Sequence, residues 1–237
     1  MSQPSEPELR ELLAQSCRIL YKLGLSDYLG HPSVRIAGSD RVLIKPKHSP
    51  RVRGMDTMTA DVMIEVDLDG KLVRGEDAPP SEVFIHTEIY RARPDVVSVV
   101  HTHQPMSTLA GIVGLPILPV LHVAAPLVER QPVPTFACAE LVVNPSLGQR
   151  LAAALGKHRV CHLQGHGIVS VAETIEDATI GAVHLEQLAE VNYRAAQVGR
   201  EPRVIPQNEI DALKRNLAPL AGRWAYYAEL ANRGVGG

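Results

Sequence analysis

Residues 80–105, PSEVFIHTEIYRARPDVVSVVHTHQP, contain the two adjacent elements that decide the fold of this chain. The preceding Pro79-Pro80 pair leads into a predicted helix at about residues 81–93, which Pro94-Asp95 ends. Residues 96–102 follow as a β-branched run and predict a buried strand. A helix that leads directly into a buried strand favours an α/β fold.

The chain on both sides of this segment continues the α/β pattern. Ser5 and Glu8 have the spacing of a capping box, and the helix that they begin is expected to end at Gly24. Further strands are predicted at residues 33–36, 42–44, 62–66, 71–73, 117–123, 160–163 and 168–171. Further helices are predicted at residues 146–155, 175–198 and 208–231. We therefore expect one domain over residues 1–237, an α/β/α sandwich with a C-terminal helical segment at about 208–231.

The composition is that of a globular protein and argues against several classes of partner. Hydrophobic residues make up 45% of the chain and charged residues 21%, with a net charge of −2 and a pI near 6.6. No basic block favours nucleic acid, and no apolar run reaches the ~20 residues of a membrane span. Without a signal-peptide pattern at the N-terminus, we expect a cytoplasmic protein that acts on a small acidic or polar molecule. Three scattered cysteines predict buried thiols rather than disulfides.

Histidines at two places in the sequence indicate a metal site. His101 and His103 are two residues apart at the end of a strand, so their side chains point to the same face. His166 lies between two glycines after another strand, and Glu82 lies at the start of a helix, where a carboxylate is favoured. An H-x-H pair alone could be two unrelated histidines. Three neutral histidines with a carboxylate suit Zn²⁺ in an open catalytic site, with Mn²⁺, Co²⁺ or Fe²⁺ as alternatives.

Residues 80–105, followed about sixty residues later by LQGHGIV at 163–169, resemble the class II aldolase/adducin family. The resemblance extends from the first helix to about Tyr193. It implies a central mixed, mainly antiparallel sheet. It also implies one divalent metal ion per subunit, with His101, His103, His166 and Glu82 as the ligands. Members of the family commonly form homotetramers with sites at subunit interfaces, and we expect a homotetramer or higher homo-oligomer.

The sequence differs from the sugar-phosphate branch of that family at its phosphate-binding segments. Residues 30–35, GHPSVR, stand where that branch has GNVSxR, and residues 45–48, KPKH, replace its Thr-Gly loop. Pro80-Ser81 replaces a Ser-Ser pair before Glu82. These segments, and the helix at 81–93, are more similar to the decarboxylase branch, whose substrates are ortho-hydroxy aromatic or heteroaromatic dicarboxylates.

The expected activity is therefore a divalent-metal-dependent, non-oxidative decarboxylation through a metal-stabilised carbanion or enolate, as part of aromatic compound catabolism. The expected catalytic residues are Glu82 and His31. The expected substrate-binding residues are Arg35, Lys47, Ser81 and Tyr227, with Tyr226 as an alternative to Tyr227 across a subunit interface. Arg is suited to bidentate contact with a carboxylate.

Each assignment has a structural alternative. Arg35 could form a salt bridge at a sheet edge, Lys45 and Lys47 could be solvated loop charges, and His31 could be structural. His86, one turn after Glu82, could support the site or lie on an ordinary helix surface. His122 could face the metal cleft from the end of the predicted 117–123 strand.

Two other functions remain open at this point. The first is a class II aldolase that cleaves a hydroxy-keto acid or a sugar (phosphate). The absence of tyrosine between His103 and His122 disfavours it, because the family's aldolases use a tyrosine there. The second is a non-catalytic, adducin-like interaction module, which would not need three convergent histidines.

Overall fold

An eight-stranded sheet forms the centre of the protein in the computed structural model, which describes residues 4–217 and 220–233. The strands are β1 His31–Arg35, β2 Arg41–Ile44, β3 Ile64–Asp67, β4 Leu72–Arg74, β5 Ser98–Thr102, β6 Thr135–Phe136, β7 Val160–Leu163 and β8 Gly167–Ala172. Their order is β4-β3-β2-β1-β5-β8-β7-β6. Neighbours are antiparallel except β6 and β7, which are parallel. The predicted mixed, mainly antiparallel sheet is confirmed.

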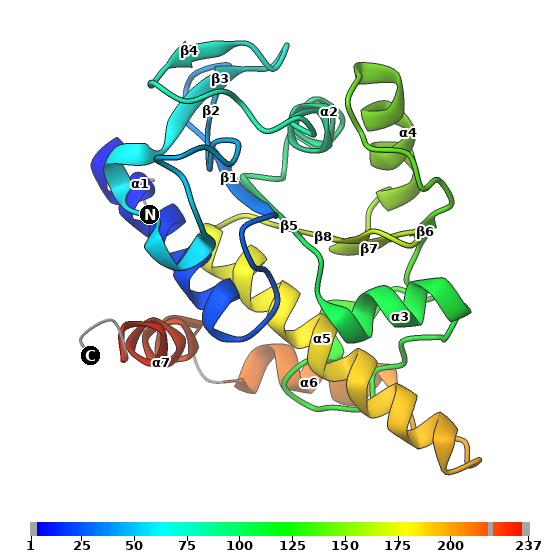
Figure 1. The fold of residues 1–237 in the computed structure, drawn as a ribbon. Helices are drawn as coiled ribbons and strands as arrows, with labels where there is room; N and C mark the ends of the chain where they lie inside the picture. The colour runs from blue at the N-terminus through cyan, green and yellow to red at the C-terminus, as the bar shows by residue number, and fades with distance from the viewer. Residues whose placement is uncertain (1–3, 218–219, 234–237) are drawn as a thin grey trace.

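Helices cover both faces of this sheet (Figure 1). They are α1 Glu6–Lys22, α2 Phe84–Ala92, α3 Pro105–Val113, α4 Pro145–Leu155, α5 Ile175–Gln197, α6 Gln207–Asn216 and α7 Leu220–Asn232, with 3-10 turns η1 Met55–Thr57, η2 Ala60–Val62 and η3 Ala125–Val128. Helices α2 and α4 pack together on one face, and α1, α5 and α7 pack on the other. The α/β/α sandwich is confirmed.

Side chains along the central strands point alternately into two separate hydrophobic cores, one on each face of the sheet. Val100 of β5 and Ile168 of β8 belong to the core under α1 and α5. Val99 and Val169, one residue along, belong to the core under α2 and α4. Successive strand residues point to opposite faces, so a sheet buried on both faces needs continuous apolar runs.

The register of β5 brings His31, His101 and the turn before β8 to the same end of the three strands β1, β5 and β8. His31 of β1 lies opposite His101 of β5, and Thr102 lies opposite Ile168 of β8. The end of β5 therefore meets the beginning of β1 and the turn that enters β8. Strand pairing thus brings residues that are far apart in the sequence together at this end of the strands.

A buried polar network fixes the chain directly after this edge, at the start of α3. The Gln104 side chain accepts a hydrogen bond from Thr102 Oγ1 (2.8 Å) and donates to Ser107 Oγ (2.8 Å). From α5, the Glu186 carboxylate accepts the backbone N–H groups of Met106 and Ser107, each at 2.8 Å. A carboxylate at a helix N-terminus is stabilised by the unpaired N–H groups there. Helix α3 was not predicted, and Glu186 holds its start from α5, which is about eighty residues away in the sequence.

The predicted strand at residues 117–123 is wrong, and no strand is present in that part of the described chain. Pro116 and Pro119 lack the N–H groups that a sheet ladder requires. The segment is instead tied to α5 through Asn192, whose amide bonds the backbone of Leu118 at 3.1 and 3.3 Å. His122 lies exposed in this irregular segment and not at a strand end.

The C-terminal helical segment predicted at about 208–231 is two helices, α6 and α7. Residues 218–219, between them, lie outside the described residues, as do residues 1–3 and 234–237 of the expected 1–237 domain. Helix α6 ends at Asn216, and the next residue, Leu217, has extended backbone angles. Among the described helices, none is long and apolar enough to cross a membrane. Cys17 and Cys161 are buried thiols, whereas Cys138 is partly exposed.

The close approach of β8 to β5 gives a stability prediction. A Cβ added at Gly167 would lie 2.2 Å from the backbone oxygen of Thr102 and 3.1 Å from Cδ2 of His103. Gly167→Ala must push β8 away from β5, and we expect the free energy of unfolding to fall by roughly 1–3 kcal/mol. Urea denaturation followed by circular dichroism measures this change.

The matched control is Gly222→Ala in α7, where nothing lies within 4 Å of an added Cβ. That variant should be neutral or stabilising by up to ~1 kcal/mol, because alanine favours helices over glycine. Equal stabilities of the two variants would contradict the tight β5–β8 contact.

Candidate metal centre

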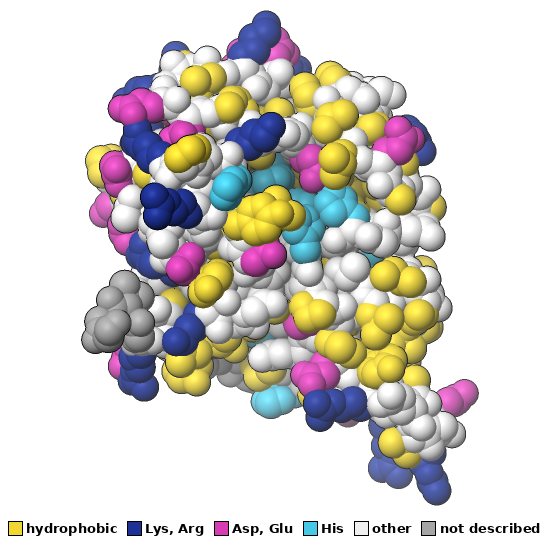
Figure 2. Space-filling model, in the orientation of Figure 1, with side chains coloured by type: hydrophobic (Ala, Val, Ile, Leu, Met, Phe, Trp, Pro, Cys, Tyr) yellow, Lys and Arg dark blue, Asp and Glu magenta, His cyan; other side chains and the backbone are white. Residues whose placement is uncertain are grey.

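Three histidine Nε2 atoms converge at the end of β5. His103 Nε2 lies 3.0 Å from His101 Nε2 and 3.2 Å from His166 Nε2. Figure 2 shows histidine side chains gathered on one face of the molecule, with an acidic side chain beside them. The strand alternation predicted for His101 and His103, and the glycine turn at His166, therefore bring these three residues together.

His101 is fixed with its Nε2 toward this cluster. Its Nδ1–H donates to the backbone oxygen of Ile168 at 2.9 Å, which leaves Nε2 without a hydrogen and with its lone pair free. Burial lowers the pKa of His101 well below its usual value, and repulsion from His103 and His166 lowers it further. Burial and His166 also lower the pKa of His103. Neutral imidazoles of this kind are suited to coordinate a cation.

Glu82 completes the group from the turn that precedes α2. Its Oε1 accepts the backbone N–H of Val142 at 2.9 Å, and its Oε2 lies 3.4 Å from His166 Nε2 and 4.0 Å from His101 Nε2. Burial would raise the pKa of Glu82, but the hydrogen bond and charge of His166 and the amide of Val142 outweigh it, so the pKa is lowered. Glu82 is therefore ionised at neutral pH.

The spacing of these donors fits a divalent metal ion. In a tetrahedral zinc site with Zn–N bonds of about 2.0–2.1 Å, two ligand nitrogens lie about 3.3 Å apart. The two measured Nε2–Nε2 distances, 3.0 and 3.2 Å, are close to that value. Each of His101, His103 and His166 offers one ligand atom within 4.8 Å of the others. Nitrogen and carboxylate donors of this kind also suit other first-row divalent ions.

A family model described as "Class II Aldolase and Adducin N-terminal domain" matches residues 11–193, more than half of the chain. The chain belongs to the class II aldolase and adducin family. A 3,4-dihydroxyphthalate decarboxylase from Terrabacter sp. (strain DBF63) is 34% identical over 212 residues, which cover 86% of this chain and 88% of that protein. A 5-methylthioribulose-1-phosphate/5-deoxyribulose-1-phosphate aldolase from Rhodospirillum rubrum is 32% identical over 209 residues, with 86% and 88% covered.

The fold of the family is also that of a solved aldolase II superfamily protein from Pseudomonas syringae. Its structure matches with a TM-score of 0.80 at 24% identity and covers 98% of this chain and 95% of that chain. Decarboxylases and aldolases are both carbon–carbon lyases, so the chain is placed in a lyase family.

His31, on β1, borders the candidate metal-binding group. One ligand atom each of His31, Glu82 and His101 lie within 4.8 Å of one another. The His31 Nδ1 lies 2.7 Å from Nε2 of His86, so Nε2 is the ring nitrogen of His31 left for the site. Burial lowers the pKa of His31 well below its usual value, and repulsion from His86 lowers it further. His31 is a neutral imidazole beside the candidate ligands.

Lys47 and Ser81 lie on two exposed segments joined by a backbone hydrogen bond. Lys47 N–H donates to the Ala78 oxygen at 2.9 Å, so the loop after β2 runs beside the segment that leads to Ser81 and Glu82. Both side chains are exposed. Ser81 directly precedes Glu82 and Lys47 is bonded to the segment that leads to it, so both stay candidate substrate contacts.

Arg35 and Tyr227 are not brought to the cluster within one protomer. Arg35 ends β1 four residues after His31, which is about 13 Å along a strand. Its guanidinium donates to the Tyr90 backbone oxygen and lies over the Tyr90 ring, 4.9 Å from its centroid. Tyr227 packs, partly buried, against the core on the α1 and α5 side. Their roles toward substrate stay predictions, and for Tyr227 they concern a neighbouring subunit.

Two buried residues near the site were not assigned from the sequence. His86 is fully buried and not on a helix surface, because the face of α2 that carries it packs on β1. Lys45 is only 2% exposed, and its Nζ donates to the backbone oxygens of Tyr28 (3.2 Å) and Pro46 (3.3 Å). Its position directly after the apolar β2 residues was the available signal that it is not a solvated loop charge.

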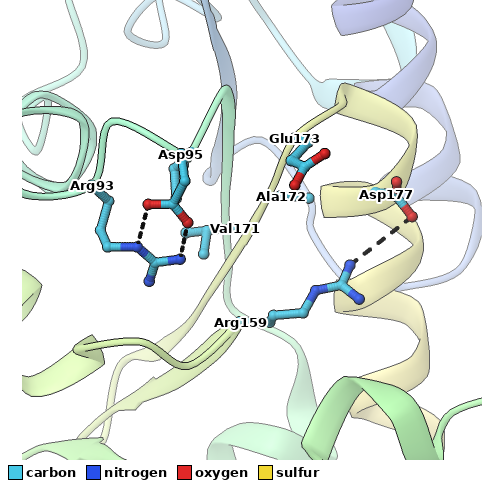
Figure 3. A pocket seen from close by; sticks show the side chains of 8 residues that line it. Arg93, Asp95, Arg159, Val171, Ala172, Glu173 and Asp177 are labelled. Carbon is cyan, nitrogen blue, oxygen red and sulfur yellow. Dashed lines mark hydrogen bonds and ion pairs between the residues drawn. The ribbon is translucent and has the colours of Figure 1, made fainter. Parts of the chain in front are cut away.

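A separate cavity of about 370 Å³ lies at the opposite edge of the sheet, before β5 begins and where β8 ends (Figure 3). Its arginines already face carboxylates. Arg93 pairs with Asp95 at 2.6 Å, and Arg159 lies 4.0 Å from Asp177. The histidine cluster is at the other end of the same strands, so this cavity is not part of the metal centre.

The ligand assignment predicts the effect of removing one histidine. His101→Ala deletes a fully buried nitrogen donor, and we expect bound zinc after dialysis to fall to under about one tenth of the wild-type content. Plasma mass spectrometry of the purified protein measures the metal content. His122→Ala, at an exposed histidine away from any strand, is the control and should keep full occupancy. Full zinc occupancy in His101→Ala would disprove the ligand role.

Proposed function

We propose that this family member is a divalent-metal-dependent decarboxylase of an ortho-hydroxy aromatic or heteroaromatic carboxylate. The observation that carries the proposal is His31, a buried neutral imidazole beside Glu82 and His101. By resemblance, the sugar-phosphate branch has a small amide at this position. The 34% identity to a 3,4-dihydroxyphthalate decarboxylase supports the same branch.

In the proposed reaction the histidines bind the substrate end that loses carbon dioxide, and Glu82 accepts a proton. Substrate binds with its ring hydroxyl and neighbouring carboxylate toward His101, His103 and His166. A divalent metal, Zn²⁺ first and Mn²⁺, Co²⁺ or Fe²⁺ as alternatives, would supply Lewis-acid stabilisation of the negative charge that decarboxylation leaves. The ionised Glu82 accepts the proton of the ring hydroxyl, and Val142 N–H holds its carboxylate in place.

The carbon–carbon bond breaks next, and the reaction as a whole takes up one proton from solvent. The bond between the ring carbon and the carboxylate breaks, carbon dioxide leaves, and its electron pair stays on the ring carbon. Glu82 gives its proton to that carbon, which leaves a ring one carboxylate shorter with its oxygen deprotonated, and one proton taken up from solvent then restores the ring hydroxyl. Neutral His31 donates or accepts a hydrogen bond at Nε2 and orients the substrate during this exchange. Lys47, at the exposed rim, faces a second substrate carboxylate, with Ser81 beside it.

The assembly and location belong to the same proposal. We place the protein in the cytoplasm as a homotetramer or higher homo-oligomer, with sites at subunit boundaries. Tyr227, or the 61%-exposed Tyr226, would then reach a neighbouring subunit's site from α7. Arg35 is retained as a candidate carboxylate contact only if the assembled protein brings substrate to the far end of β1.

A class II aldolase is the second candidate, favoured by the 32% identity to the Rhodospirillum rubrum aldolase over the same share of the chain. An adducin-like module without activity is the third, and the complete His/Glu group argues against it. The aldolase and the decarboxylase differ in the group that leaves, an aldehyde or carbon dioxide.

A product assay separates these functions. The full-length protein, loaded in turn with Zn²⁺, Mn²⁺ and Co²⁺, is given 3,4-dihydroxyphthalate, a hydroxypyridine dicarboxylate and 5-deoxyribulose 1-phosphate. We expect carbon dioxide from an aromatic acid and no aldehyde from the phosphosugar, with Glu82→Gln as the inactive control. Aldehyde release without carbon dioxide would refute the decarboxylase proposal, and neither product with any metal would favour the module.

The proposed contact of Lys47 with a second substrate carboxylate gives a kinetic prediction. Lys47→Met removes the cation proposed for the second carboxylate, so KM should rise roughly tenfold or more while kcat changes little. Lys71→Met removes an exposed lysine between β3 and β4 and should leave both constants unchanged. Steady-state kinetics on the turned-over acid measures both. An unchanged KM in Lys47→Met would remove Lys47 from the site.

A further inference from the structure

A chain of buried hydrogen bonds leads away from His31 into the interior between β1 and α2. His31 Nδ1 lies 2.7 Å from His86 Nε2, and His86 Nδ1 lies 2.6 Å from Ser33 Oγ. Ser33 Oγ in turn lies 2.7 Å from the Tyr90 hydroxyl oxygen. The four side chains are between 0% and 7% exposed. His31 and Ser33 share one face of β1, and His86 and Tyr90 are one turn apart on α2.

The chemistry of the groups couples their orientations. A neutral imidazole has one N–H donor and one acceptor nitrogen, so the bond on one side of His86 sets the bond on its other side. Burial lowers the pKa of His86 to about 3, which keeps that ring neutral. Once Ser33 and Tyr90 set the direction of the chain, the tautomer of His86 and then that of His31 follow. The hydrogen bonds of such a network polarise one another in a low-dielectric interior.

Both ends of this chain are anchored. At the far end, the Arg35 guanidinium donates to the Tyr90 backbone oxygen and covers the Tyr90 ring at 4.9 Å. At the near end, His31 lies opposite His101 in the β1–β5 pairing. The links between them are buried side chains held by β1 and α2. The chain therefore offers no route for a proton to solvent, but it can hold a ring in one position and one tautomer.

We propose that His86, Ser33 and Tyr90 are positioning residues that fix the ring direction and tautomer of His31, so that its Nε2 is presented to the substrate in a single hydrogen-bonding state. The assignment rests on the proposed function only for the identity of the substrate that His31 meets. A supporting partner of this kind typically changes activity by roughly 10- to 100-fold when it is removed.

The test removes one hydroxyl at a time from the hydrogen-bonded chain of His31, His86, Ser33 and Tyr90. Full-length, zinc-loaded wild type, Ser33→Ala and Tyr90→Phe are compared, with Thr87→Val as the matched control. Thr87 is also fully buried on α2, but its hydroxyl has no hydrogen-bond partner among the residues that the structure describes. Two readouts are taken: the ¹⁵N shifts of the His31 ring, assigned by their loss in His31→Gln, and kcat and KM for whichever substrate is turned over. Zinc content and thermal midpoint are recorded for each variant.

In wild type we expect one protonated and one unprotonated ring nitrogen on His31, with widely separated shifts. In Ser33→Ala the two shifts should move toward each other as tautomers interconvert, and kcat should fall roughly tenfold with KM within about twofold. Tyr90→Phe, which leaves the ring and its Arg35 contact, should show a smaller effect in the same direction. Thr87→Val should match wild type in both readouts.

The proposal is overturned if folded Ser33→Ala or Tyr90→Phe keeps the wild-type His31 shifts, or if Ser33→Ala and Thr87→Val lose kcat equally. If Ser33→Ala does not fold, Tyr90→Phe alone decides. The outcome is separable from that of the proposed function. A wild-type protein that releases aldehyde instead of carbon dioxide refutes the decarboxylase, while the His31 shifts still decide the positioning chain.

Discussion

The antiparallel pairing of β5 with β8 is the constraint on which the site depends. It sets Thr102 opposite Ile168, and the same edge provides the Ile168 oxygen that accepts the Nδ1–H of His101. That one bond turns Nε2 of His101 toward the cluster. His166 enters from the turn before β8, so a shift of this register would separate it from the β5 histidines. The rigidity of a sheet buried on both faces places the donors at little ordering cost.

Burial at this edge has two consequences that act together. It keeps His101 and His31 neutral, because desolvation penalises the charged imidazole and lowers the pKa of each. It also favours a hydrogen-bond partner for the ring nitrogens of His101 and His31, since an unpaired buried polar group is costly. His101 finds a backbone oxygen, while His31 finds His86. The same desolvation thus keeps the candidate ligand His101 neutral on one side of the site, and it favours the hydrogen-bonded chain from His31 on the other side.

Features that depend on local spacing could be predicted from the sequence, whereas features that depend on tertiary contacts could not. The H-x-H alternation at His101 and His103 and the predicted mixed sheet agree with the structure, because strand geometry is local. The strand predicted at 117–123 failed because its apolar residues pack in the core without a partner strand. His86 could not be assigned, because its partner Ser33 is more than fifty residues away and helical spacing does not reveal which face meets β1. The family resemblance indicated the candidate ligands, whereas the proposed substrate depends on exposed residues such as Lys47, whose contacts neither the family nor the sequence pattern reveals.

X-ray absorption spectroscopy at the zinc edge of the full-length, zinc-loaded protein tests whether the three histidines bind one metal ion. We expect three imidazole nitrogens at about 2.0–2.1 Å with one or two oxygen ligands, and two imidazoles in His103→Ala. A sulfur shell at about 2.3 Å, or an imidazole count that His103→Ala does not change, would contradict the convergence of His101, His103 and His166 on one metal ion.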